Sequence, residues 1–167
     1  MAGTREGGPR GRWQHAPSAR GGRSVVKRGV AEREAALVRI PLFAELPKRY
    51  VRELARACGV ADYAEGETVV KQDAAGDVCY VILEGQARVV RNGRRLATIA
   101  AGDFFGEMSL LDGAPRTASV ITDEPSRLLS LPRQAFVELL GQNSSIASKV
   151  LAIVARRLRA QERPLIG

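Results

Sequence analysis

The stretch that decides the fold is Gly102–Val120, with the sequence GDFFGEMSLLDGAPRTASV. It opens on a Gly-Asp turn, passes through two aromatic residues and continues into EMSLL, a run that is compatible with a short helix. Asp112-Gly113-Ala114-Pro115 predicts a second turn, after which Arg116 begins a predicted strand. The stretch therefore predicts two turns around a short helix, followed by a strand.

The same stretch has the chemistry of an anion site. The first N–H groups of a helix have no partner within the helix and attract negative charge. Gly106 lets a ligand approach the backbone closely, and Arg116 supplies a positive charge with planar donors that suit a phosphate. Glu107 is an acid beside this cradle, which makes sense if it accepts a hydrogen bond from a sugar hydroxyl. These residues predict a site for a small nucleotide with one phosphate and a free sugar hydroxyl.

A simpler interpretation gives the stretch no ligand. In that interpretation Glu107 is a helix-start acid and Arg116 is a solvated charge. The apolar members would then be ordinary core residues, namely Phe104, Phe105, Met108, Leu110 and Leu111.

The run FGEMSLLDGAPRTASV resembles the phosphate-binding cassette of the cyclic nucleotide-binding domain family. That family includes regulatory subunits of cyclic-AMP-dependent kinase, cyclic-nucleotide-gated channels and bacterial catabolite-activator-type regulators. The runs AEGETVVKQ and CYVILEGQARV extend the resemblance to about residues 35–160. Family members usually carry glycine where this chain has Asp73, and Asp adopts positive φ more readily than most residues. This departure concerns the shape of one turn and leaves the predicted site unchanged.

The resemblance implies a set of ligand contacts. Arg116 and the first N–H groups of the short helix would meet the phosphate, and Glu107 would bond the ribose 2′-hydroxyl. Thr117 bears on the identity of the base, because a threonine there accompanies cyclic GMP in eukaryotic relatives, whereas bacterial relatives with a hydroxyl residue there often bind cyclic AMP. We therefore expect cyclic AMP rather than cyclic GMP. The expected contacts are Val69, Leu83, Val89, Phe105, Gly106, Glu107, Met108, Ser109, Arg116, Thr117 and Ala118.

Outside this stretch, the pattern predicts an α+β fold. Helical patterns occupy residues 30–58, where Pro47 suits a first helical position and Gly59 suits the position just past a helix end. Short strand-like runs fill residues 60–131, with Asn92-Gly93 as the strongest hairpin signal. Two further helices follow over residues 132–162. The prediction is an antiparallel, jelly-roll-like β-roll between N-terminal and C-terminal helices.

The last predicted helix carries an apolar stripe whose role the sequence leaves open. Packing on the roll is one interpretation, and a mobile helix that covers the base or pairs with a second subunit is the other. The stripe consists of Ile146, Val150, Ile153, Val154 and Leu158.

The net charge of +8 is concentrated at the N-terminus, because residues 1–28 are rich in arginine and contain Glu6 as their single acid. Their Gly, Arg, Pro and Ser content predicts a disordered basic tail, or alternatively a polybasic arm for nucleic acid, anionic lipid or an acidic partner. We predict that residues 29–162 form the cyclic nucleotide-binding domain.

The composition argues against catalysis and metal binding. His15, the single histidine, lies in the predicted tail, and no nucleophile or long phosphate-loop motif is present. Cys58 and Cys79 lack the spacing of metal ligands. Both lie in apolar segments, so we expect buried free thiols in a reducing cytoplasm. We expect no enzyme activity, no metal, no cofactor apart from the nucleotide ligand, no membrane span and a cytoplasmic location.

Three functional hypotheses remain. The first is a cyclic-nucleotide sensor without an effector domain, which signals through its last helix to a protein partner or a second copy. The second is a ligand-free scaffold that acts on a protein or nucleic acid through its basic tail. The third is a cyclic dinucleotide site, whose second phosphate would meet a cluster of arginines in the sequence, namely Arg88, Arg91, Arg94 and Arg95.

Overall fold

The computed structural model describes residues 29–162, so the predicted basic tail at residues 1–28 lies outside the described residues. The helices are α1 (Val30–Val38), α2 (Lys48–Ala57), α3 (Glu107–Asp112), α4 (Arg133–Gln142) and α5 (Ser144–Glu162). The strands are β1 (Gly59–Tyr63), β2 (Thr68–Val70), β3 (Val78–Glu84), β4 (Gln86–Arg91), β5 (Arg94–Ala100), β6 (Phe104–Phe105), β7 (Ser119–Thr122) and β8 (Ser126–Pro132).

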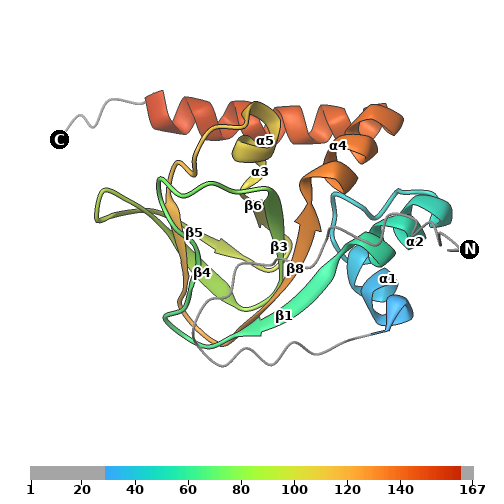
Figure 1. The fold of residues 1–167 in the computed structure, drawn as a ribbon, viewed down its shortest axis with the longest axis horizontal. Coiled ribbons are helices and arrows are strands. Elements are labelled where there is room, and N and C mark those ends of the chain that lie inside the picture. Colours follow the sequence, from blue (N-terminus) through green and yellow to red (C-terminus); the bar gives the residue numbers. More distant parts are fainter. Residues whose placement is uncertain (1–28, 163–167) are drawn as a thin grey trace, which may run out of the picture.

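The strands form two four-stranded sheets, ordered β1-β8-β3-β6 and β2-β7-β4-β5. Every pairing in both sheets is antiparallel. In Figure 1, α1 and α2 lie to one side of the roll, while α5 runs along its top, above α3. The predicted β-roll flanked by helices is therefore confirmed.

Two apolar clusters hold this arrangement together. One joins the helices to the first sheet, with Phe43, Leu54, Phe136 and Val150 among its buried members. The other fills the interior of the roll. Within it, the Phe105 ring stacks on the Tyr80 ring at a centroid distance of 5.3 Å. Because burial of apolar surface drives folding, the short β6–α3 segment is fixed by its aromatic residues, and the residues that follow them are positioned with it.

Two turns have the backbone that the sequence predicts. Asn92 and Gly93 both have positive φ, 51° and 76°, as a tight two-residue hairpin between β4 and β5 requires. Asp73 also has positive φ, 66°, and its N–H donates to the Arg116 carbonyl at 2.8 Å. The turn with aspartate in place of the usual glycine therefore keeps the left-handed backbone and supports the loop that carries Arg116.

Two of three local predictions are wrong. Gly59 stands just past the end of α2, as predicted, and it also begins β1, because Cys58 is already extended (φ −78°, ψ 150°). A Cβ at Gly59 would lie 2.8 Å from Ser130 Oγ, so the glycine permits close pairing of β1 with β8. Pro47 precedes α2 as its N-cap rather than standing in its first turn. Arg116 does not begin a strand, since β7 starts at Ser119.

The stripe on α5 divides in two. Asn143 caps the helix by accepting the Ile146 N–H at 3.0 Å. Ile146 and Val150 are buried against the roll, and Ile153 and Val154 are partly buried. Leu158 is 43% exposed, so the predicted stripe does not pack along its whole length. The first half of α5 is core, and the second half extends over α3.

The two buried cysteines give a first prediction. Burial raises the pKa of the Cys58 thiol to about 12, although nearby Arg33 lowers it in part. Burial also raises the pKa of the Cys79 thiol, and the Glu107 carboxylate raises it further. Neither thiol should react with an alkylating reagent in the folded protein at pH 8, whereas both should react in denaturant.

The raised pKa values of the two thiols also predict how the free energy of unfolding depends on pH. Thiols of the unfolded chain ionise above about pH 8.5, while the folded ones stay protonated, so the free energy of unfolding should fall as the pH rises above that value. Mass spectrometry of the alkylated protein measures how far the thiols react. Denaturant titration at several pH values measures the free energy of unfolding. Rapid labelling of the native protein would contradict the burial of both thiols.

Candidate functional site

A cavity of about 540 Å³ opens between α3, the loop after it, the β4–β5 wall and α5. All but two of the residues predicted to contact a ligand line it. These are Val89, Phe105, Gly106, Glu107, Met108, Ser109, Arg116, Thr117 and Ala118. The structure thus gathers the short helix, the arginine loop and one strand of the roll around a single space.

Arg116 is the central cation of the cavity. The residue is only 6% exposed, and its guanidinium donates to the Gly106 carbonyl at 2.8 Å and to the Val78 carbonyl at 2.6 Å. Among residues 29–160, no carboxylate forms an ion pair with it. A buried charge without an opposite charge is costly, so this guanidinium suits an anionic ligand.

Two glycines make room for this guanidinium. A Cβ at Gly76 would overlap the guanidinium group, and one at Gly106 would lie 2.6 Å from Arg116 Nη1. Gly106 also has positive φ, 84°, where a side chain would strain the backbone. The sequence predicts that Gly106 lets a ligand approach closely, whereas in the structure this glycine makes room for the Arg116 side chain.

Glu107 is the central acid of the cavity and meets an unexpected partner. Its side chain is 1% exposed, and Oε1 accepts a bond from Arg157 Nη1 at 2.5 Å. The other oxygen, Oε2, is buried and has no hydrogen-bond partner within the described part of the chain. Glu107 therefore has one carboxylate oxygen engaged by α5 and one free to accept a further donor.

Arg157 belongs to α5 and links that helix to β6 as well. Its Nη2 donates to the Phe104 carbonyl, and the guanidinium carbon lies 4.9 Å from the centre of the Phe104 ring. These contacts fasten the second half of α5 to the segment formed by β6 and α3.

The β4–β5 wall adds two arginines to the rim, Arg91 and Arg95. Arg95 pairs with Asp123 at 2.8 Å, and Arg88 bonds the other oxygen of the same carboxylate. The hydrogen bond from Arg88, with the charge of Arg95, holds the pKa of Asp123 below its usual range. Arg91 forms no ion pair with any acid among residues 29–160. The cavity therefore carries more positive than negative charge.

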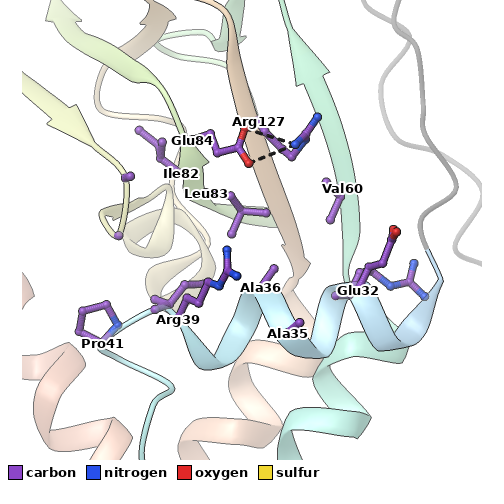
Figure 2. Close-up of a pocket in the computed structure, with 14 residues that line it drawn as sticks. Glu32, Ala35, Ala36, Arg39, Pro41, Val60, Ile82, Leu83, Glu84 and Arg127 are labelled. Carbon is purple, nitrogen blue, oxygen red and sulfur yellow. Dashed lines mark hydrogen bonds and ion pairs between the residues drawn. The ribbon is translucent and has the colours of Figure 1, made fainter.

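Two predicted contacts lie elsewhere. Leu83 lines a second cavity of about 490 Å³ between α1 and the roll, as Figure 2 shows beside Arg39 and the Glu84–Arg127 pair. Val69 packs against the core of the roll, and its neighbour Val70 lines the ligand cavity instead. The pairing register of β2 shifts between Thr68 and Val70, and such a bulge interrupts the simple alternation that a sequence pattern assumes.

Three arginines of the cavity were not among the predicted contacts. The sequence points to Arg91 and Arg95 only as members of the arginine cluster that could meet the second phosphate of a cyclic dinucleotide. The sequence shows of Arg157 only that it lies near the end of an amphipathic helix. Its contact with Glu107 could not be predicted, because the two residues are 50 positions apart in the sequence.

Two observations bear on other classes of site. Among the described residues, no group of three or more His, Cys, Asp and Glu side chains could hold a metal ion. Within the same residues, no helix has both the length and the hydropathy that crossing a bilayer requires.

Comparison with known proteins gives the family. Residues 60–143 match the model of the cyclic nucleotide-binding domain. The chain belongs to the cyclic nucleotide-binding domain family, as its cassette indicates.

Relatives of two kinds are similar to this chain. The cyclic AMP receptor protein of Thermus thermophilus is 34% identical over 62% of this chain and 50% of the relative. A cGMP-dependent protein kinase of Toxoplasma gondii is 28% identical over 80% of this chain and 13% of the kinase. The solved structure of the regulatory domain of Toxoplasma gondii PKA with cAMP has a TM-score of 0.67 at 25% identity, over 77% of this chain and 50% of that one. The chain thus spans half or less of these relatives.

The glycine cradle gives a second prediction. In Gly76→Ala, the added Cβ should displace the Arg116 guanidinium and lower the free energy of unfolding by about 1–3 kcal/mol, through overpacking and loss of buried hydrogen bonds. Gly141→Ala is the matched control, because a Cβ there meets no atom within 4 Å and alanine favours the helix. Denaturant titration measures both variants, and equal stability of the two would contradict the tight fit.

Proposed function

We propose that this chain binds a cyclic nucleotide in the 540 Å³ cavity, with cyclic AMP preferred to cyclic GMP. The observation that carries the proposal is the buried Arg116 guanidinium, which has no acidic partner among the described residues. Membership of the cyclic nucleotide-binding domain family supports the same conclusion independently.

The phosphate would bind at Arg116. The two observed bonds to backbone carbonyls use two of the five N–H donors of the guanidinium, which leaves donors for an anion. The bonds also hold the planar group in place before the ligand arrives, so little side-chain entropy is lost on binding. The N–H groups of Glu107 and Met108, at the start of α3, lie in the same wall of the cavity and would add donors to the phosphate.

The ribose would bind at Glu107. The free Oε2 of this buried carboxylate is suited to accept the 2′-hydroxyl, because a buried acceptor without a donor carries a desolvation penalty that the hydroxyl would remove. The base would then lie toward Val89 of β4 and Thr117 of the loop after α3, both of which line the cavity. We favour cyclic AMP because the cyclic AMP receptor protein is the more identical of the two relatives, at 34% against 28%.

Signalling would pass through α5. Arg157 ties this helix to the carboxylate that would hold the ribose, so ligand binding and helix position share one group. A ligand shifts such an equilibrium only by its difference in affinity for the two helix positions. Leu151 and Leu158 leave apolar surface on α5, 65% and 43% exposed, which a protein partner or a second copy could cover. We propose a regulatory protein of the cytoplasm, without enzyme activity of its own.

Calorimetric titration with cyclic AMP and cyclic GMP tests the proposal, with variants of Arg116 as the third prediction. Arg116→Ala should weaken binding about 100-fold or more, since the phosphate loses its charged partner. Arg133→Ala, which removes an exposed arginine of α4, should leave the affinity unchanged. Arg116→Lys tests the geometry separately, because lysine keeps the charge and loses the fork.

Failure of both nucleotides to bind the wild-type protein at millimolar concentration, by heat and by thermal stabilisation, would exclude the proposed ligand. A cyclic dinucleotide site and a basic-tail scaffold would then be the remaining hypotheses, and the scaffold rests on residues 1–28, outside the described residues.

Glu107 gives the fourth prediction. Wild-type protein should bind cyclic AMP about tenfold more tightly than 2′-deoxy cyclic AMP, because the deoxy compound leaves Oε2 unpaired. In Glu107→Gln that preference should shrink to about twofold or less, as a neutral amide accepts a weaker bond than a carboxylate. Competition titration with the two nucleotides measures the ratio. An unchanged preference in Glu107→Gln would place the 2′-hydroxyl elsewhere.

A further inference from the structure

The tip of the β4–β5 hairpin is fixed beside the loop that carries Arg116. Gln72 donates from Nε2 to Asn92 Oδ1 at 2.8 Å and accepts the Asn92 N–H at the same distance. The Gln72 N–H donates to Ser119 Oγ at 2.9 Å, and the next residue, Asp73, bonds the Arg116 carbonyl. The hairpin tip is therefore held at the phosphate end of the cavity.

Arg91 is the last residue of β4, directly before this tip. It lies two positions after Val89, so both residues face the same side of the strand, and both line the cavity. Arg91 is half-buried, yet it has no ion pair or hydrogen bond from its side chain in the described part of the chain. Arg88 and Arg95 differ from it, because both bond Asp123.

Folding does not explain this arginine. Arg91 stands directly opposite Arg94 in the hairpin register, and like charges at such positions destabilise a sheet. Neither residue has a carboxylate partner among residues 29–160. The hairpin thus keeps a repulsive pair whose cavity-facing member is unpaired, and an anion in the cavity would relieve the repulsion.

We propose that Arg91 is a second phosphate contact, which acts with Arg116 on the bound nucleotide and contributes to its affinity through charge. The buried Arg116 would bind the phosphate from the floor of the cavity. Arg91 would reach the same phosphate from the β4–β5 hairpin, at the rim of the cavity. This inference rests on the proposed function, because it takes the nucleotide phosphate as the anion.

The test compares Arg91→Ala with Arg94→Ala. Both variants remove the same cross-strand repulsion, but only Arg91 lines the cavity. Cyclic AMP and cyclic GMP are titrated into wild-type protein and both variants at about 50 mM and about 300 mM salt, and the thermal midpoint of each ligand-free protein is recorded. Arg91→Ala should bind about three- to tenfold more weakly at the lower salt, and the difference should narrow at the higher salt.

The ligand-free midpoint of Arg91→Ala should equal or exceed that of the wild type, because the variant loses a repulsion, and a structural role would instead lower it. Arg94→Ala should bind within about twofold of the wild type. Equal affinities of the two variants, with wild-type binding intact, would overturn the role of Arg91 and leave the proposed function standing. Absence of wild-type binding to either nucleotide would overturn both.

Discussion

The buried guanidinium of Arg116 is the constraint on which the rest of the site depends. A positive charge at 6% exposure, without a carboxylate partner among the described residues, is held by two backbone carbonyls from β3 and from the residue before α3. Gly76 and Gly106 give it space, and the Asp73 turn fixes the loop on which it stands. These features stabilise an arrangement that would be unfavourable in a protein with no anion to bind, because an isolated buried charge destabilises the folded state.

The Glu107–Arg157 pair extends this site to the C-terminal helix. The carboxylate is almost fully buried, while the arginine comes from the half of α5 that lies beyond the packed residues Ile146 and Val150. The position of this half of the helix therefore depends on polar contacts at the cavity more than on apolar burial. Segments with few buried apolar contacts are the ones that move at low energetic cost. This division of α5 gives a physical basis for the proposed coupling between the cavity and the exposed surface of the helix.

Much of this could be predicted from the sequence, because the cassette is local. Gly106, Glu107 and Arg116 are close in the chain, and turn chemistry at Asn92-Gly93 and Asp73 fixes the backbone through residues a few positions apart. The errors have a different origin. Leu83 and Val69 do not line the ligand cavity, because a strand pattern does not specify which side of the strand meets the cavity or where a bulge, such as the one between Thr68 and Val70, interrupts the alternation. Arg157 could not be assigned to Glu107, since nothing in a helical stripe specifies which distant carboxylate one of its arginines will meet.

The most direct test of the central claim is the structure of this chain with cyclic AMP bound. A phosphate oxygen should lie within hydrogen-bond distance of the Arg116 guanidinium, and the ribose 2′-hydroxyl should lie against Oε2 of Glu107. A nucleotide bound in the second cavity beside α1, or one whose phosphate does not contact Arg116, would contradict the assignment of this buried arginine as the anion site.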